Sequence, residues 1–441
     1  MATPVPPRQL YAWVWLPGAT EPVVAGVLTR TEAVYDTHPI ITFTYARSYR
    51  ERDNAISLFT PELPLQGGTF DPTRPGETLG VLTATSTLTV GPSWTREQQP
   101  LPMHSCLRDA APDAWGRRVI NLRLGGDRSQ EFDELTYLRQ SGSDRIGALD
   151  FQDSPTEYIP RGDTADLKYL LRAAELLEAG EPIPPDLAAA AARGTSIGGA
   201  RPKALLSDGS RSLIAKFPSS TDTRPVVKAE AAAMLLAARV GIDVANVEVH
   251  LVDKRDVLLV ERFDRGADGT RRGMVSALTV MGENEIGSRH SSYAAIAESI
   301  RTGPWSSISA TLTELFRRMV FNVCIGNTDD HLRNHATFWD GHRLTLTPAY
   351  DLEPVQRNTS VASHAIGLTR TEHHSQLRYC VDAAPEFHID RVGAQAIIDQ
   401  VVSTIQRDWN DVCDEARLTK AERDTLFGRE FLNAYIFQDE P

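Results

Sequence analysis

Two short stretches, the octapeptide NTDDHLRN at residues 327–334 and the heptapeptide TLTPAYD at residues 345–351, decide how this chain is interpreted. In the first, Asp329 and Asn334 are five residues apart, the spacing of the aspartate and asparagine in a protein-kinase catalytic loop. In the second, Asp351 ends an apolar, strand-like run, where a kinase carries its metal-binding aspartate. Three oxygen-bearing side chains at these separations can hold magnesium and accept a proton, so together they predict a phosphoryl-transfer site.

A helix with one buried face is predicted directly before the octapeptide. Its apolar residues recur at helical spacing: Leu312, Leu315, Phe316, Met319, Val320 and Val323. Gly326 suits a left-handed helix end, and Cys324 on the same helix is expected to be a buried thiol. The octapeptide would then emerge from a rigid support, as a catalytic group requires.

In the roles that this pattern favours, Asp329 accepts the proton of an incoming hydroxyl, and Asn334 and Asp351 bind magnesium. Two other interpretations compete with it. The octapeptide alone could be an Asp-rich helix cap or turn. His331 and His335 could form a metal site at i, i+4, although His335 leads into an apolar run and is expected to face the core.

Lys216, in the string LIAKF at residues 213–217, resembles the strand lysine that grips nucleotide phosphates in kinases. Glu230 begins an almost wholly apolar helical stretch, so its carboxylate needs a partner, and Lys216 is the candidate. The alternative is that Glu230 only favours the positive amino end of its helix.

The Gly-rich segment 194–203 precedes that strand, and its glycines would let backbone N–H groups approach phosphate oxygens. Arg201 and Lys203 add positive charge for an anion, although an ordinary flexible turn remains an alternative. Further on, residues 258–264 end the strands of the predicted small lobe, where a kinase has its hinge. There the backbone at Glu261 and Phe263 would contact the adenine edge, and Asp264 would bind the ribose. The alternative is a strand end with salt bridges.

Composition sets limits on the function. The chain of 441 residues has a net charge of −12, which argues against direct binding to a nucleic-acid backbone, so a nucleic-acid role would need a basic partner. The four cysteines are scattered without a C-x-x-C pair, so neither a zinc ribbon nor a disulfide framework is indicated. With no secretory signal and no apolar run of ~18 residues, we expect a bacterial-type cytoplasmic protein without a membrane span.

The order of predicted elements suggests three domains. Residues 8–155 are expected to form a β-rich amino-terminal subdomain, beginning with an antiparallel sheet. After a Pro- and Glu-rich connection, residues 186–263 read as a kinase small lobe with the Gly-rich loop, and residues 264–441 as a mainly helical lobe. The predicted fold class is therefore α+β, with a bilobal, protein-kinase-like architecture.

These strings together resemble the HipA family of bacterial serine/threonine kinases, the toxins of HipBA-like toxin–antitoxin pairs. The resemblance covers essentially the whole chain. Five motifs carry it in the family's order: residues 195–203, 215–218, 260–265, 327–334 and 348–351.

The resemblance implies ATP and Mg²⁺ as cofactors and a role for each matching residue. Asp329 corresponds to the catalytic base, and Asn334 and Asp351 to the magnesium ligands. Residues corresponding to nucleotide-binding positions are Ile197, Gly198, Gly199, Lys216, Glu261, Phe263, Asp264 and His331. Glu230 and Lys203 would support them. Ser196 matches the serine that the family autophosphorylates, and a phosphate there would be repelled by the phosphates of ATP.

The chain also departs from the family pattern. Arg201-Pro202 stands where other members often differ, and Asp330 follows the catalytic aspartate where some members have glycine. Asp330 could bind a second metal, sit in solvent or alter substrate choice. Leu352 follows Asp351, so control by an Asp-Phe-Gly flip is not expected.

By the same resemblance, the expected target is a translation-related protein, glutamyl-tRNA synthetase, whose phosphorylation produces dormancy and persistence. The expected partner is a small helix-turn-helix antitoxin dimer like HipB, with DNA contacted only through that complex. Two alternatives stay open: a small-molecule phosphotransferase, and a non-catalytic corepressor subunit of the antitoxin.

Overall fold

The computed structural model describes residues 6–35, 38–77, 101–124, 131–162, 167–181, 184, 187, 201–356 and 361–438. The chain forms two compact units, which are described separately. Unit 1 comprises Met1–Ser220, Asp264–Val275 and Phe338–His342. Unit 2 comprises Thr221–Phe263, Ser276–Thr337 and Arg343–Pro441. The three predicted domain ranges stay predictions, because compactness alone does not define a domain boundary.

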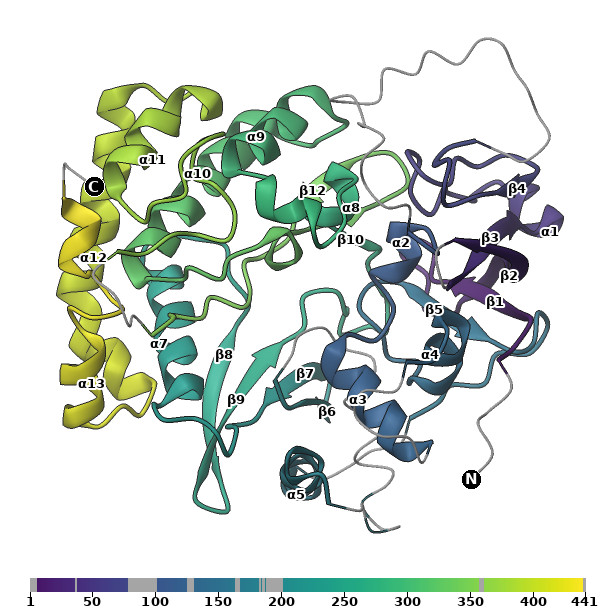
Figure 1. Cartoon of the computed structure of the whole chain (residues 1–441), viewed down its shortest axis with the longest axis horizontal. Coiled ribbons are helices and arrows are strands. Elements are labelled where there is room, and N and C mark those ends of the chain that lie inside the picture. Colours follow the sequence, from purple (N-terminus) through teal and green to yellow (C-terminus); the bar gives the residue numbers. More distant parts are fainter. Residues whose placement is uncertain are drawn as a thin grey trace. The chain divides into compact units, whose positions relative to one another are not determined.

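Unit 1 contains a five-stranded antiparallel sheet in the order β4-β3-β2-β1-β5 (Figure 1). Its strands are β1 (Gln9–Val14), β2 (Val23–Tyr35), β3 (His38–Tyr45), β4 (Thr69–Phe70) and β5 (Leu149–Gln152). Gly26 pairs with Ala12, and a Cβ there would lie 2.3 Å from the carbonyl oxygen of Thr44. The antiparallel sheet expected at the amino terminus is therefore present, and glycine is required at its tightest point.

The described part of unit 1 also contains short helices and a hairpin. The helices are α1 (Arg47–Arg50), α2 (Ser105–Arg108), α3 (Ala114–Arg123), α4 (Glu134–Gln140) and α5 (Leu167–Ala179). In the sequence, the Pro112-Asp113 pair predicts a helix start. Asp113 does cap α3 there by accepting the Gly116 N–H at 3.0 Å. The hairpin joins β6 (Lys203–Asp208) to β7 (Arg211–Lys216) and places Lys203 directly opposite Lys216.

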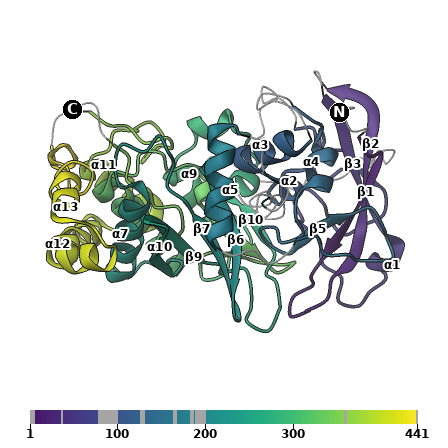
Figure 2. The ribbon, with the colours of Figure 1, turned by 90° about the horizontal axis from the view of Figure 1, so that it is seen from below.

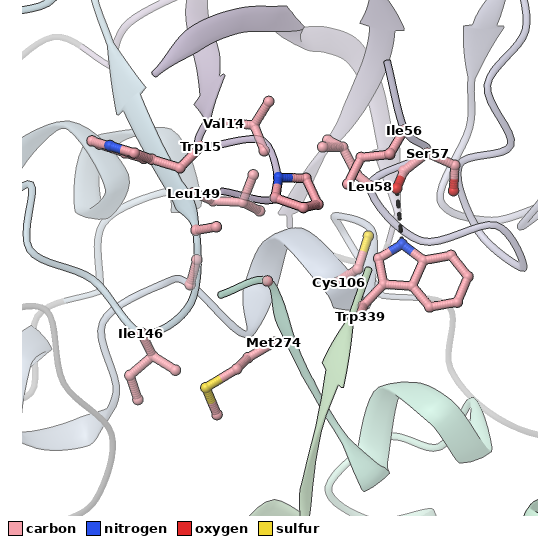
Figure 3. A pocket seen from close by; sticks show the side chains of 14 residues that line it. Val14, Trp15, Ile56, Ser57, Leu58, Cys106, Ile146, Leu149, Met274 and Trp339 are labelled. Atoms are coloured by element: carbon pink, nitrogen blue, oxygen red, sulfur yellow. Dashed lines mark hydrogen bonds between the residues drawn. The ribbon is translucent and has the colours of Figure 1, made fainter. Parts of the chain in front are cut away.

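A small cavity lies among apolar side chains of unit 1, including Val14, Leu58, Cys106 and Met274 (Figure 3). Beside them, the indole N–H of Trp339 donates to the Ser57 carbonyl at 2.9 Å. The cavity volume is about 30 Å³. Because small-molecule sites usually span roughly 300–1,000 Å³, this cavity is a packing defect rather than a nucleotide pocket.

Unit 2 is mainly helical. It carries the antiparallel hairpin β8 (Val247–Val252) and β9 (Arg255–Glu261), strand β12 (Leu344–Leu346) and short η turns at Gly287–His290, Leu332–Asn334, Ala384–Phe387 and Ala434–Phe437. Its helices are α7 (Val226–Arg239), α8 (Ala277–Met281), α9 (Tyr293–Thr302), α10 (Ile308–Ile325), α11 (Leu377–Ala383), α12 (Arg391–Glu415) and α13 (Lys420–Leu426). Helix α12 packs against α7 and α10 (Figures 1 and 2). Strands β10 (Met274–Ser276) and β11 (Ala336–Trp339) contain residues of both units.

Most of the predicted elements of the second half are present. The sequence predicts a helix over about residues 226–240 that Gly241 closes, and strands over residues 247–252 and 257–261. Helix α7 ends before Gly241, whose φ is +83°, and β8 and β9 lie at the predicted strands. Helix α5 and strand β6 were not predicted. The sequence also predicts that Asp186 caps an Ala-rich helix over residues 187–192, but Asp186 and most of that range lie outside the described residues.

The described cysteines Cys106, Cys324, Cys380 and Cys413 are buried free thiols, as predicted for Cys324. Burial raises the pKa of Cys324, so it is protonated and inert at neutral pH. Within the described ranges, no helix has both the length and the apolar character needed to cross a bilayer.

Candidate active site

Helix α10 supports the octapeptide as predicted. All six apolar residues that define its expected buried face are fully buried. The helix ends at Gly326, whose φ is +67° and where a Cβ would lie 2.8 Å from the Glu430 carbonyl oxygen. The Leu432 N–H also donates to the Cys324 carbonyl at 2.7 Å, so a distant segment of unit 2 covers the end of this helix.

The two adjacent aspartates of the octapeptide point in opposite directions. Asp329 is exposed, as a group that meets a substrate must be, whereas Asp330 is only 1% exposed. The Asp330 carboxylate accepts hydrogen bonds from the Tyr293 hydroxyl and, at 2.9 Å, from Nε2 of His335. Asp330 is therefore a buried structural group and not a solvated one.

The hydrogen bonds around Asp330 continue back to the start of the loop. The Tyr293 hydroxyl accepts from the Asn322 side chain at 2.8 Å, and Asn322 in turn accepts from the Asn327 side chain at 3.1 Å. Asn327 also donates its backbone N–H to the Asn322 carbonyl at 2.9 Å. A continuous buried chain of contacts thus links Asn327, the first residue of the octapeptide, to His335, the residue directly after it. We call it the Asp330 network.

The charge of Asp330 follows from these contacts. Burial alone would raise its pKa, but the His335 ring and the Tyr293 hydroxyl outweigh burial and hold the pKa below its usual value. The carboxylate is consequently ionised at neutral pH and accepts from both partners. Burial and the neighbouring Asp330 charge raise the pKa of Tyr293 well above its usual value, so Tyr293 remains a hydrogen-bond donor.

The two sequence stretches that carry the predicted chemistry meet in unit 2. The Tyr350 hydroxyl donates to the Arg333 carbonyl at 2.5 Å, which ties the residue before Asp351 to the residue before Asn334. Thr347 donates its backbone N–H to the Ala336 carbonyl at 3.0 Å. The segment leading to Asp351 therefore runs beside the end of the octapeptide.

Asp351 has a left-handed backbone, with φ at +58°. Such a conformation is unfavourable for a residue with a side chain and is concentrated at functional sites. The chain after it is held in place: Val355 donates to the Gly326 carbonyl at 3.1 Å, and Arg224 donates to the Pro354 carbonyl at 2.5 Å. These contacts fix the direction in which the chain leaves Asp351.

Asn334 ends a short η turn in which its N–H donates to the His331 carbonyl at 2.8 Å. An asparagine amide oxygen and an aspartate carboxylate are hard oxygen ligands of the kind that magnesium prefers, so Asn334 and Asp351 suit that ion by donor chemistry. His335 is 3% exposed and bonded to Asp330, as expected of a core residue. Within the described residues no cluster of three or more His, Cys, Asp or Glu side chains could hold a metal.

The predicted hinge residues fall in different surroundings. Glu261 ends β9, and its N–H donates to the Asn246 carbonyl at 2.8 Å. The ring of Phe263 lies 5.8 Å from the ring of Tyr350. Asp264 belongs to unit 1, where it is 3% exposed and accepts from the Gly147 N–H at 2.7 Å and from Arg265 at 2.9 Å. Its predicted ribose contact therefore competes with structural bonds and stays a prediction.

The predicted phosphate-binding residues are only partly described. Lys216 ends β7 opposite Lys203, and Lys203 is buried 3.9 Å from the Asp113 carboxylate. Glu230 is buried in α7 of unit 2, whereas Lys216 belongs to unit 1, so the predicted Lys216–Glu230 pair stays a prediction. Ser196, Ile197, Gly198 and Gly199 lie outside the described residues.

Sequence reasoning missed two residues of this region, Tyr293 and Asn322. Asn322 carries a signal, because an amide within a buried helical run needs a polar partner. Tyr293, 29 residues earlier, carries none, because its role arises from tertiary packing alone.

Comparison with known proteins agrees with this fold. The HipA N-terminal domain matches residues 14–152, and the HipA-like C-terminal domain matches residues 195–409. Y4mE of Sinorhizobium fredii, whose name assigns it provisionally to the kinases, is 29% identical over 298 residues, covering 60% of this chain and 68% of that protein.

One solved structure shows the fold class. A Shewanella oneidensis MR-1 structure described as the toxin–antitoxin system HipA, HipB and its operator DNA aligns with a TM-score of 0.65 and 17% identity, covering 96% of this chain and 99% of that one. The Helicobacter pylori proinflammatory kinase CtkA aligns with a TM-score of 0.38 and 13% identity, covering 53% and 90%. The chain has the predicted α+β, kinase-like HipA fold.

With both domain types of one family matched in order along the sequence, this chain belongs to the HipA family.

Proposed function

We propose that this chain is an ATP-dependent protein serine/threonine kinase that acts as the toxin of a toxin–antitoxin module. The Tyr350–Arg333 hydrogen bond carries the proposal, because it brings the segment of Asp351 against the segment of Asp329 and Asn334 within one unit. The kinase name of the relative Y4mE adds support.

In this mechanism Asp329 accepts the proton of the acceptor hydroxyl as that oxygen bonds to the γ-phosphorus of ATP and the bond to the leaving ADP breaks. Asn334 and Asp351 would hold Mg²⁺, which neutralises phosphate charge. Lys216 and Lys203, opposite each other on β7 and β6, would supply positive charge for the phosphates. Ile197, Gly198, Gly199, Glu261, Phe263, Asp264 and His331 complete the proposed nucleotide contacts, with Glu230 as support.

The substrate proposal rests on family membership. A translation-related protein, glutamyl-tRNA synthetase in the family expectation, is the proposed target, and Ser196 is the proposed autophosphorylation site. The proposed partner is a HipB-like helix-turn-helix dimer in the cytoplasm, since the similar Shewanella structure is a complex with HipB and operator DNA. The net charge of −12 fits DNA contact through such a partner.

Purified protein incubated with γ-³²P-ATP and magnesium tests the activity. We expect label on the protein itself and on purified glutamyl-tRNA synthetase, and its loss on chelation of magnesium. Asp329→Asn should reduce transfer by about 10²–10⁴-fold with an unchanged melting temperature, because Asp329 is exposed. Absence of all labelling by the wild-type protein, alone or with a cell lysate, would overturn the kinase proposal.

Mass spectrometry separates the finer alternatives. Phosphate on Ser196 supports autophosphorylation of the Gly-rich loop, and phosphate found only on added small alcohols or aminoglycosides supports a small-molecule kinase. If Asp329→Asn remains as toxic in cells as the wild type, the corepressor function is favoured.

A further inference from the structure

Asp330 has the contacts of a residue that holds the catalytic loop. It follows the exposed Asp329 in the chain, yet its own carboxylate is buried with Tyr293 and His335. The Asp330 network anchors the octapeptide on both sides, through Asn322 at its first residue Asn327 and through His335 directly after its last residue. Asp329 and Asn334 lie between these two anchored ends.

We propose that Asp330 is a positioning residue: its buried carboxylate, held by Tyr293 and His335, fixes the loop that carries Asp329 and Asn334. This inference rests on the proposed kinase function for its catalytic consequence, but the loop-holding role can be tested without activity. It also answers what a second aspartate does at this place, since a group that is 1% exposed and already bonded is neither solvated nor available to a substrate.

The supports behind the network are themselves rigid. Tyr293 begins α9 and its N–H donates to the Gly367 carbonyl at 2.8 Å, while its ring lies edge-on to the His335 ring at 5.4 Å. The His335 carbonyl accepts from the Ala277 N–H at 2.7 Å. Asn322 lies on the buried face of α10. The network therefore joins Tyr293 of α9 and Asn322 of α10 to His335, and of these Tyr293 and His335 contact Asp330 directly. Loss of one contact should loosen the loop without unfolding the unit.

The phenolic hydroxyl of Tyr293 offers the cleanest test, because Tyr293→Phe removes one oxygen and keeps the ring. Tyr137→Phe is the matched control: its hydroxyl is also buried and also bonded to an asparagine side chain, Asn121 at 3.0 Å, but it lies in unit 1. Each hydroxyl takes part in two hydrogen bonds, since Tyr293 also accepts from Asn322 and Tyr137 also accepts from the Phe132 N–H at 3.2 Å. A purely structural role therefore predicts a similar outcome for both variants.

We expect Tyr293→Phe to lower kcat by about 10–100-fold while KM for ATP changes less than about threefold, because loop misplacement affects the chemical step more than nucleotide binding. Tyr137→Phe should keep kcat within about twofold at a temperature where both variants are folded. Asp330→Asn, which keeps an oxygen acceptor for Tyr293, should retain more activity than Asp330→Ala. Equal kcat values for Tyr293→Phe and Tyr137→Phe would overturn the positioning role.

Hydrogen–deuterium exchange of the peptide covering residues 327–335 provides the second measurement. Tyr293→Phe should speed exchange there, and Tyr137→Phe should not. If the wild-type protein has no kinase activity but this difference is observed, the proposed function fails and the loop-holding role stands. If the wild-type protein is active and the exchange rates and kcat match the control, the proposed function stands and the role of Asp330 fails.

Discussion

Asp113 in unit 1 and Asp330 in unit 2 are both aspartates of low exposure, yet their acidities differ in direction. Desolvation raises the pKa of Asp113 to about 6, since its main compensation is Lys203 at 3.9 Å and the backbone N–H groups of α3. At Asp330 burial also acts to raise the pKa, but direct bonds from His335 and Tyr293 bring it below the usual value. Burial therefore does not set the charge of a carboxylate; the number and closeness of its donors do.

The difference separates two uses of a buried acid. Asp113 caps a helix, a role that the neutral acid can also fill through its carbonyl oxygen. Asp330 is held as an anion by a ring of donors beside the proposed catalytic base. A helix cap can therefore act in either protonation state, whereas Asp330 holds its loop as the ionised carboxylate.

The largest expected loss of stability is at Asp150 in unit 1, whose carboxylate accepts from more side chains than that of Asp330 does. Its fully buried carboxylate accepts from Arg145 and Arg161, both at 2.8 Å, and from Gln152 at 2.7 Å. Asp150→Ala leaves the buried Arg145 without its anion and should cost about 3–5 kcal/mol of unfolding free energy. Urea unfolding followed by circular dichroism measures the loss.

Asp153→Ala is the matched control for Asp150→Ala. Asp153 pairs with Arg139 at 3.0 Å, but its side chain is 57% exposed, so its loss should cost at most about 1 kcal/mol. Equal losses of unfolding free energy in the two variants would contradict the rule that the number of donors around a buried carboxylate sets its contribution to stability.

The second prediction is that the effect of Asp113→Asn on stability depends on pH. Because the folded pKa of about 6 exceeds the unfolded value of 3.8, the folded state binds the extra proton between these values. The resulting stability is fully present below pH 3.8 and is lost as pH rises through 6. Asparagine mimics the protonated cap, so the variant should match the wild type near pH 3.5 and exceed its stability by about 2–3 kcal/mol at pH 8.

Thermal or urea unfolding at both pH values measures this difference. The Asp330 carboxylate has the opposite sign, because its depressed folded pKa gives stability that is present above pH 3.8 and lost as pH falls further. An Asp113→Asn variant that is less stable than the wild type at pH 8 would show that the Lys203 contact outweighs desolvation at this cap.

The smallest effect is expected at an uncharged cap in unit 2. Thr419 caps α13 in a capping box with Glu422, and both side chains are exposed to solvent in part. Thr419→Ala should cost about 1 kcal/mol at all pH values where Glu422 is ionised. Thr425→Ala on the exposed face of the same helix is the control and should cause no measurable loss of unfolding free energy. A loss in Thr419→Ala that changes with pH above pH 6 would contradict the expected difference between this cap and Asp113.

Much of the frame of the candidate site was predictable from local pattern. The apolar spacing of α10, the left-handed Gly326 and the strand before Lys216 follow from periodicity and backbone preference, and each is present. The meeting of the Asp351 and Asn334 segments also followed from recognisable motif order.

What could not be predicted depends on tertiary partners. Asp329 and Asp330 are chemically identical neighbours, and only the placement of Tyr293 and His335 decides which one turns inward. For Asp264 the sequence left a ribose contact and a salt-bridged strand end both open, and only the tertiary structure shows that Gly147 and Arg265 donate to its carboxylate. Strand β6 was not predicted, because only its pairing with β7 marks residues 203–208 as a strand.

The segment that covers the end of α10, residues 430–432, is synthesised after the proposed catalytic loop. The Cys324 carbonyl receives the Leu432 N–H, and Glu430 packs against Gly326. These partners leave the ribosome long after the octapeptide they support. A nascent chain that has not reached residue 432 contains every residue of the proposed catalytic loop. It lacks the segment that covers the end of α10, from which this loop emerges. The proposed catalytic loop of an unfinished chain therefore lacks the backbone hydrogen bond that Leu432 supplies to the end of α10 in the finished protein.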